Sequence, residues 1–102
     1  MVFPSAPVAE QFERVVTATA AEFERDLRMA WPDGVQGTLA NGFMLSCGDV
    51  RLDVAALPNG IRRLGILELP VLLVRYRFTG GDDSSRRRFL HRLDRSMQRG
   101  GG

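Results

Sequence analysis

The sequence predicts an α+β domain in which an N-terminal helix, an antiparallel meander of about four strands and a C-terminal helix follow one another, with the helices packed on the sheet. Three observations predict this order. Residues 8–30 carry apolar side chains at the three- and four-residue spacing of a helix. Residues 35–78 show strand-like patterns divided by turn sequences. Residues 82–99 return to helical spacing after a pair of glycines.

Length and composition set the domain organisation. The chain has 102 residues, of which 44% are hydrophobic and 25% are charged, and this is typical of one globular domain. We expect a single domain over residues 1–102, with flexible ends at residues 1–6 and 100–102. No apolar run approaches the roughly 18 residues that cross a bilayer, and the first residues lack the features of a signal peptide. The sequence therefore predicts a cytoplasmic protein that does not enter a membrane.

The first helix is predicted to have about six turns. Ser5 is its candidate N-cap, and Pro7 suits the first turn. The helix should end near Trp31, because Pro32 disfavours helical geometry at the residue before it. Trp31 would then close over the core. The apolar face of this helix would consist of Val8, Phe12, Val15, Val16, Thr19, Phe23, Leu27 and Ala30.

Three short strands are predicted next, over residues 35–39, 43–47 and 50–56. Each has apolar residues at alternate positions, as expected for a strand that buries one face. The connecting turns contain glycine, which adopts the positive φ angles that tight turns require. These turns are predicted at Asn41-Gly42, Gly48-Asp49 and Pro58-Asn59-Gly60.

The segment Leu64–Phe78 is predicted to be the fourth and longest strand. In its second half apolar residues alternate with Arg75 and Arg77, which is typical of a strand with one wet face. Its first half is apolar in both phases and should be covered on both sides. Pro70 cannot donate a ladder hydrogen bond, so it indicates an edge position, a bulge or a bend.

An exposed apolar patch is predicted on this strand if both helices cover the same face of the sheet. The patch would consist of Leu67, Leu69, Val71 and Leu73. Its area would be on the order of several hundred Å², more than a soluble monomer usually exposes. The simplest partner is a second copy of the chain related by a two-fold axis. We therefore predict a homodimer with these four residues at its interface.

Charge is unevenly distributed along the chain. Residues 1–60 carry four arginines and eight acidic residues, whereas residues 61–102 carry ten arginines and four acidic residues. The start of a helix offers free N–H groups to an anion. Asp82 and Asp83 can pair with the same arginines, so a solvated and internally paired face is the alternative. The basic face also lacks aromatic side chains for stacking on bases. The candidate anion or nucleic-acid site consists of Arg86, Arg87, Arg88, Arg92, Arg95 and Arg99.

Cys47 and His91 are of types that can act in catalysis, but the pattern around each predicts a structural role instead. Cys47 is in phase with Phe43 and Leu45, so a buried, inert thiol is predicted. His91, the single histidine, is predicted to face solvent. One cysteine and one histidine do not make a protein-only zinc site. We predict no catalytic residue, no metal site and no cofactor, and hence a protein that is not an enzyme.

The glycine pair before the second helix invites comparison with phosphate-binding loops. Gly80-Gly81 is not followed by the Lys-Ser/Thr ending of such loops, so the comparison fails. Asp82 and Asp83 have the chemistry to bind a hard cation, but further oxygen ligands at calcium-loop spacing do not follow. Capping of the second helix is the predicted role of these acids.

The last third of the chain resembles a family of short bacterial proteins whose function is uncharacterised. The resemblance therefore implies a bacterial origin and no particular activity. It rests on Leu69-Pro70, Val74, Phe78, Phe89-Leu90, Leu93-Asp94 and the ending Gln98-Arg99-Gly100-Gly101-Gly102.

The order of helix, sheet and helix is also similar to that of frataxin-like iron-handling proteins. The acidic first helix of those proteins would correspond to the acids of residues 10–26. Here the acids alternate with arginines, and the sheet segments contain no tryptophan. This resemblance is an analogy of architecture alone. The acids concerned are Glu10, Glu13, Glu22, Glu24 and Asp26.

Three functions remain open from the sequence. The favoured one is a non-catalytic interaction module, homodimeric through the sheet, whose acidic first helix and basic second helix present opposite potentials to an unidentified protein partner. The second is anion or nucleic-acid binding through the basic helix. The third is a small-ligand site or an enzyme site between sheet and helices, which requires an apolar cavity with convergent polar groups.

Overall fold

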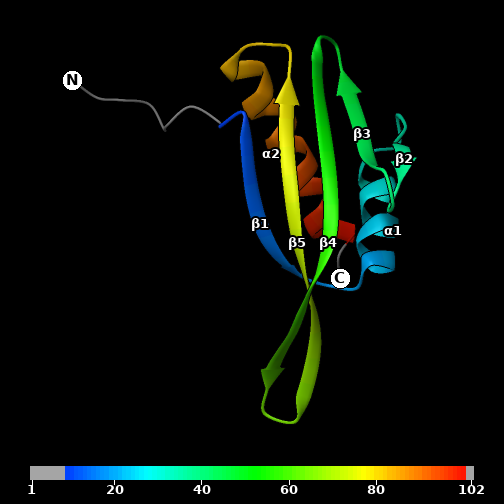
Figure 1. Ribbon diagram of the computed structural model, residues 1–102. Helices are drawn as coiled ribbons and strands as arrows, with labels where there is room; N and C mark the ends of the chain where they lie inside the picture. The colour runs from blue at the N-terminus through cyan, green and yellow to red at the C-terminus, as the bar shows by residue number, and fades with distance from the viewer. Residues whose placement is uncertain (1–8, 101–102) are drawn as a thin grey trace, which may run out of the picture.

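The computed structural model describes residues 9–100, with side chains as far as residue 98 (Figure 1). The expected flexible ends, residues 1–6 and 100–102, and the Ser5 cap lie outside the described residues, except for the backbone of Gly100. The elements are β1 (Gln11–Thr17), α1 (Ala20–Ala30), β2 (Gln36–Thr38), β3 (Gly42–Cys47), β4 (Val50–Leu64), β5 (Leu67–Thr79) and α2 (Asp83–Gly100).

The strands form one antiparallel sheet in the order β1-β5-β4-β3-β2. Strands β2 to β5 are the predicted meander, and β1 is added at the far edge beside β5. Both helices lie on the same face of this sheet (Figure 1). The predicted α+β fold, with helices packed on an antiparallel sheet, is confirmed, with five strands in place of about four.

The predicted six-turn first helix is wrong in its first half. Residues 11–17 form the edge strand β1, and α1 begins at Ala20. Phe12 and Val16 are four residues apart, a spacing that suits one face of a strand as well as a helix. Thr19 ends the ambiguity: its hydroxyl accepts a hydrogen bond from the N–H of Glu22, and the Glu22 carboxylate accepts one from the N–H of Thr19. This capping box fixes the start of α1.

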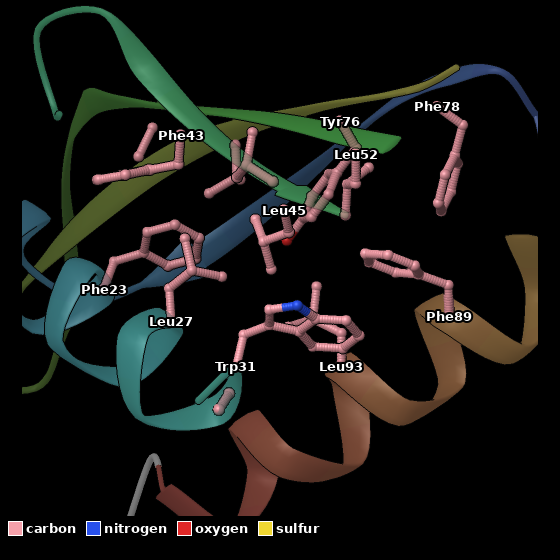
Figure 2. Packing of buried hydrophobic residues seen from close by; sticks show 14 of the residues in the cluster. Phe23, Leu27, Trp31, Phe43, Leu45, Leu52, Tyr76, Phe78, Phe89 and Leu93 are labelled. Carbon is pink, nitrogen blue, oxygen red and sulfur yellow. The ribbon is translucent and has the colours of Figure 1, made fainter. Parts of the chain in front are cut away.

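The core lies between the helices and one face of the sheet (Figure 2). Trp31 is buried where α1 ends, as predicted, and stacks on Phe89 of α2 with ring centroids 4.5 Å apart. Phe89 in turn meets Phe78 of β5 edge to face. These aromatic contacts join both helices to the sheet. The aliphatic part of the core includes Leu27, Leu45, Leu52, Leu72, Val54, Val74 and Leu93.

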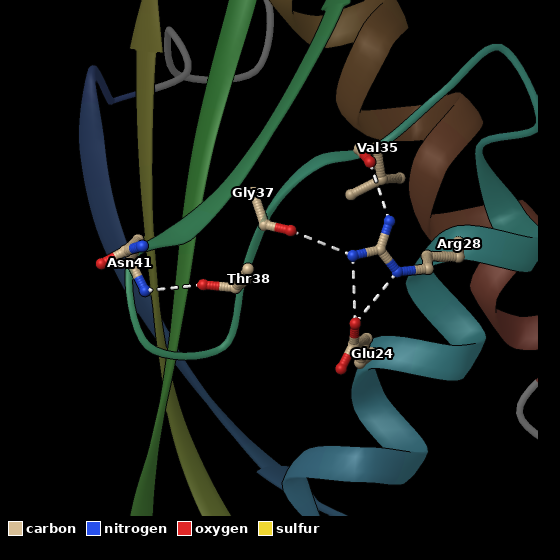
Figure 3. Close-up of polar contacts among 6 residues, drawn as sticks. All are labelled: Glu24, Arg28, Val35, Gly37, Thr38 and Asn41. Atoms are coloured by element: carbon tan, nitrogen blue, oxygen red, sulfur yellow. Dashed lines mark hydrogen bonds and ion pairs between the residues drawn. The ribbon is translucent and has the colours of Figure 1, made fainter.

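Arg28 joins α1 to the short edge strand β2 (Figure 3). Its guanidinium donates hydrogen bonds to the carbonyls of Val35 and Gly37, at 2.8 and 3.0 Å, and to the carboxylate of Glu24 at 3.0 Å. One planar, five-donor group thus satisfies two carbonyls that a three-residue strand leaves free. The same guanidinium lies over the ring of Phe43.

The predicted turn at Pro58-Asn59-Gly60 is instead an irregularity inside β4. The pairing of β4 with β5 shifts between Pro58 and Ile61, so that Asn59 and Gly60 face a single residue of β5. The chain reverses seven residues later than expected, between Leu64 and Leu67. The irregularity thus lies in β4, where Gly60 adopts a φ of 86°, and not at Pro70 of β5, where a bulge was one of the predicted alternatives.

Residues 59–70 form a two-stranded hairpin, here called the arm, that extends beyond the helices and the other strands (Figure 1). The molecule is correspondingly long, with principal extents of 47 × 36 × 23 Å. Its radius of gyration is 14.6 Å, whereas a compact chain of this length has about 13 Å. The arm is the part of the fold that contributes least to the core.

Substitution of Gly80 tests how closely the chain packs at the junction between β5 and α2. Its φ is 75°, and an added Cβ would lie 2.1 Å from the carbonyl oxygen of Asp49. Gly48 has a similar φ of 60° but open space around it, so it is the matched control. Left-handed geometry costs an alanine about 1–2 kcal/mol at either position. Crowding adds about 1–3 kcal/mol at Gly80 alone.

We therefore expect Gly80→Ala to lower the free energy of unfolding by at least about 1 kcal/mol more than Gly48→Ala. Urea denaturation at one fixed protein concentration measures the difference. Equal losses in the two variants would contradict the close approach of Gly80 to Asp49.

Candidate interaction surface

One face of the sheet, here called the open face, is not covered by either helix (Figure 1). In β5 the even-numbered residues from Leu72 to Phe78 are buried against the helices, whereas Arg75 and Arg77 point to the open face and are exposed. In β1, Phe12 faces the helices and stacks on Tyr76 at 4.8 Å. The open face is therefore formed by the other phase of every strand.

Apolar residues follow one pleat phase of β5 and its neighbouring strands, here called the apolar stripe. The pairing register aligns Val15, Leu73 and Leu57 in one row across three strands. By alternation the same phase continues onto the arm, where Leu64 pairs with Leu67 and Arg62 pairs with Leu69; β4 and β5 cross at the base of the arm, so the hairpin turns this face there (Figure 1). The apolar stripe consists of Val15, Leu57, Leu64, Leu67, Leu69, Val71 and Leu73.

The two ends of the apolar stripe are exposed and its middle is not. Leu67 and Leu64 on the arm are 58% and 55% exposed, and Val15 at the base is 57% exposed. Leu69 and Leu73 are half-buried. Val71 is only 8% exposed, which corrects the expectation that all four predicted interface residues face water. It pairs with Thr17 of β1 on one side and faces the two extra residues of β4 on the other.

The tip of the arm is apolar at its turn and basic just behind it. Ile66, in the turn, is 100% exposed. Arg62 and Arg63 follow on β4, and Arg63 makes a loose ion pair with Glu68 at 3.5 Å. Exposed ion pairs of this kind contribute about 0–1 kcal/mol. The arm therefore carries a net positive charge and a fully exposed isoleucine.

The remainder of the open face is a charged groove of about 980 Å³. Arg75 pairs with Glu13 at 2.7 Å, and Arg51 pairs with Asp53 at 3.0 Å. Arg77 is exposed in the row between Gln11 and Asp53. The open face thus has a polar half, which water solvates, and an apolar half that contains the stripe. The charged side chains that line the groove are Glu13, Arg51, Asp53, Arg75 and Arg77.

A second cavity, of about 450 Å³, lies between β1 and the two helices. The Arg14 guanidinium donates two hydrogen bonds to the Asp94 carboxylate, at 2.7 and 3.2 Å, and lies over the rings of Phe12 and Tyr76. The hydrogen bond to Asp94 raises the pKa of Arg14, and burial raises the pKa of the Tyr76 phenol. Because its polar groups pair with each other, this cluster serves to hold β1 against α2. No local pattern predicts this cluster, because the spacing of apolar residues around Arg14 fits a helix.

The arginines of α2 are largely engaged within the chain. Arg86 donates to the carbonyl of Gly80 at 2.9 Å, and Arg87 pairs with Asp83 at 2.7 Å. Arg88 donates to the hydroxyls of Ser84 and Ser85. Of the predicted pairings with Asp82 and Asp83, the structure shows Arg87 with Asp83, whereas Arg86 and Arg88 donate to a carbonyl and to two hydroxyls.

Farther along α2, Arg92 pairs with Asp33 at 3.2 Å and lies 4.2 Å from the ring centroid of Trp31. Arg95 is exposed, and the side chain of Arg99 lies outside the described residues. The six predicted arginines thus spread along more than three turns of α2. Of the five whose side chains the structure describes, none lines either of the two cavities above.

Two further expectations concern single residues. Cys47 is exposed, which corrects the predicted buried thiol. It is the last residue of β3, where alternation continues but the helices no longer cover the strand. His91 is exposed on α2, as predicted. Within residues 9–98 no three potential metal-ligating side chains come together.

Comparison with known proteins finds no match: no family model, no curated protein and no solved structure matches the chain. In the part of the chain that the structure describes, neither helix is both long and apolar enough to span a membrane. The candidate surface therefore rests on its own geometry.

Asp82 caps α2, as predicted, and its titration can be tested. Its carboxylate accepts a hydrogen bond from the N–H of Ser85 at 2.7 Å, and this bond lowers the pKa of Asp82 below its ordinary value of 3.8. A lowered folded-state pKa gives stability that is present above pH 3.8 and lost as the pH falls through the folded value.

We expect wild type to be more stable than Asp82→Ala near neutral pH, with the gap closing below pH 3.8. Asp82→Asn, which keeps a neutral acceptor, is the control, and its advantage over alanine should persist in acid. Urea midpoints measured across this pH range give the comparison. A gap between wild type and Asp82→Ala that stays constant with pH would rule out this role for the carboxylate.

Proposed function

We propose that this protein is a non-catalytic interaction module that forms a homodimer through the apolar stripe. The observation that carries the proposal is the position of both helices on one face, which leaves the base of the stripe at Val15 and Leu57 uncovered, together with an exposed arm that carries Leu64 and Leu67. An exposed apolar band on a charged protein marks a surface that binds another protein. The four residues predicted for the interface, Leu67, Leu69, Val71 and Leu73, lie in this band.

The arm itself supports the need for a partner. An isolated two-stranded hairpin is marginally stable in water, and this one is exposed along its whole length from Asn59 to Glu68. Its apolar residues add nothing to the core of their own chain. Contact with a partner would bury them and would stabilise the hairpin as part of a larger sheet packing.

The free energy available from burying the stripe favours association with a second copy of the chain. Complete burial of one large aliphatic side chain contributes about 1.5–3 kcal/mol, so the partly exposed stripe with Ile66 offers roughly 5–7 kcal/mol per copy. Association costs about 4–15 kcal/mol. One stripe alone barely offsets that cost, whereas a two-fold dimer buries two. Two stripes together offer roughly 10–14 kcal/mol, which falls within the range of that cost, so the proposal predicts a dimer that dissociates on dilution.

The contacts of α2 support this function over nucleic-acid binding. Four of the predicted basic residues, Arg86, Arg87, Arg88 and Arg92, already donate to acceptors of the same chain. Binding of a phosphate backbone by those groups would have to replace these contacts. The small-ligand alternative has less support, because the larger cavity is lined by ion pairs and Arg14 and Asp94 of the smaller one bind each other.

We also propose the cytoplasmic location that the sequence predicts, and the exposed thiol of Cys47 supports it. It is the single cysteine of the chain, so an internal disulfide is impossible. An exposed thiol stays free in a reducing compartment and tends to form intermolecular disulfides in an oxidising one. Dimer formation through the stripe does not involve this residue.

Leu67→Glu tests the interface directly. It places a charge at the exposed arm end of the stripe, and an unpaired charge in an apolar contact costs several kcal/mol. We expect the dissociation constant of the dimer to rise at least about 100-fold. Sedimentation velocity over a concentration series from micromolar to submillimolar measures this constant.

The matched control is Met29→Glu, since Met29 is an exposed apolar residue on α1, away from the open face. This variant should dimerise like wild type. Circular dichroism should show that both variants keep the wild-type secondary structure. A wild-type protein that stays monomeric over the whole concentration range would refute the proposed dimer.

A further inference from the structure

We infer that the charged groove binds an acidic segment of a partner protein, which lies extended across the strands and pairs a carboxylate with Arg77. This inference goes beyond the proposed dimer and does not depend on it. The groove begins one row beyond the base of the apolar stripe, at Glu13 and Arg75, so a dimer and a bound segment use different rows of the sheet.

Arg77 is the cation of the groove that the chain itself leaves without an acid. Glu13 accepts a hydrogen bond from Nε of Arg75 at 2.7 Å. Asp53 is the cross-strand neighbour of Arg77, but its Oδ1 accepts instead from Nη2 of Arg51 at 3.0 Å. Arg77 is exposed and forms no ion pair with any residue that the structure describes. Its guanidinium is therefore open to an acceptor from outside the chain.

The three arginines of the groove lie close together on one face. Arg75 and Arg77 are two residues apart in β5, and Arg51 of β4 lies diagonally across from Arg77, about 7–8 Å away between Cα atoms. Like charges on neighbouring positions of a sheet are unfavourable. Three arginines against Glu13 and Asp53 leave a net charge of +1 in the groove. One carboxylate from a partner would complete the balance.

The chemistry of the groove favours a peptide over a nucleic acid. Its lining combines guanidinium donors with carboxylate acceptors and with the amides of Gln11 and Gln36, which can both donate and accept. A peptide offers N–H donors and carbonyl acceptors along its whole length. A phosphate backbone offers acceptors alone, and Glu13 and Asp53 would repel it.

The aromatic rings nearest the groove do not offer the stacking surface that single-stranded nucleic acids use. Phe12 stacks on Tyr76 on the helix side of the sheet, and Phe43 is only 2% exposed. All three rings face the core, so a nucleobase in the groove would stack on none of them.

The row of paired residues through Arg77 sets the length of the segment. It runs over all five strands of the sheet, and four strand spacings of about 4.8 Å give about 19 Å. An extended peptide covers that length with about six residues. Met44, half-buried in the same row, lies two strands from Arg77 and offers an apolar contact about 10 Å away. The segment would therefore carry an apolar residue within about three positions of its acid. The row consists of Gln11, Arg77, Asp53, Met44 and Gln36.

A titration followed by nuclear magnetic resonance tests the inference. Pools of blocked hexapeptides, each with one position fixed as glutamate, glutamine or lysine and the others varied, are added to isotope-labelled protein up to millimolar concentration. We expect the glutamate pools to shift the backbone amide signals of Gln11, Asp53, Met44 and Arg77. The glutamine pools should bind at least about fivefold more weakly, because a neutral amide loses the charged pair with the guanidinium.

Arg77→Gln and Arg95→Gln are the matched variants, since each removes one exposed arginine and the same charge. Arg95 lies on α2, which covers the other face of the sheet (Figure 1). We expect Arg77→Gln to lower the affinity for the glutamate pools to that for the glutamine pools. Arg95→Gln should stay within about twofold of wild type, because solvent screens its charge from the groove.

The same titration on Leu67→Glu, the variant expected to be monomeric, separates this site from the dimer. Groove shifts that require both the glutamate and Arg77 would support the inference, whether or not the protein dimerises. Monomers by sedimentation that still bind the glutamate pools would refute the dimer alone.

Three results would overturn the inference and leave the dimer standing. The first is the absence of shifts at the groove signals with every pool. The second is an equal loss of affinity in the Arg77→Gln and Arg95→Gln variants, which would indicate a non-specific attraction between charges. The third is stronger binding of a short single-stranded DNA, or of inorganic phosphate, at the same signals.

Discussion

The structure depends on one constraint: two short helices can cover only one face of a five-stranded sheet. The stack of Trp31 on Phe89 and the edge contact of Phe89 with Phe78 bring both helices to the same face. The core is complete there, with no charged side chain buried among the described residues. Everything unusual about the molecule lies on the opposite face, where no helix is left to cover it.

The edge strand β1 shows how the chain completes that single core without a third helix. It adds Phe12 to the aromatic cluster and is held to α2 by the bidentate pair of Arg14 with Asp94. Both groups of the pair are more than a third exposed, so solvent screening reduces its contribution to stability. Its main effect is to fix the position of the strand. Val15 reaches the open face because Phe12, Arg14 and Val16 face the helices.

The sequence predicts those elements in which local pattern and tertiary structure agree. The second helix, its cap at Asp82 and the strand of Phe43 and Leu45 have one consistent period each. The sequence predicts a first helix that is too long. Phe12 and Val16 fit the spacing of a helix and that of a strand, and only pairing with β5 decides between the two. The arm was missed because Pro58-Asn59-Gly60 has the composition of a turn and serves as a bulge.

The sequence predicts that the candidate site is an apolar surface of the sheet, but it does not predict all of its residues. A strand that is apolar in both phases indicated a second apolar surface, and the residues from Leu67 to Leu73 follow from that pattern alone. Val15 and Leu57 were not predictable as their neighbours, since cross-strand pairing brings them to Leu73. The burial of Val71 depends on the two extra residues of β4. The sequence of β5 alone does not predict that bulge, because it lies in β4.

The edges of the sheet explain why association should use its open face. A free edge strand invites pairing with another chain, and both edges here are blunted. At one edge β2 is only three residues long and is tied to Arg28. At the other, β1 places Glu13 and Arg14 on opposite faces, each in an ion pair. Lateral strand addition would disturb these charges, whereas contact through the apolar stripe disturbs none of them.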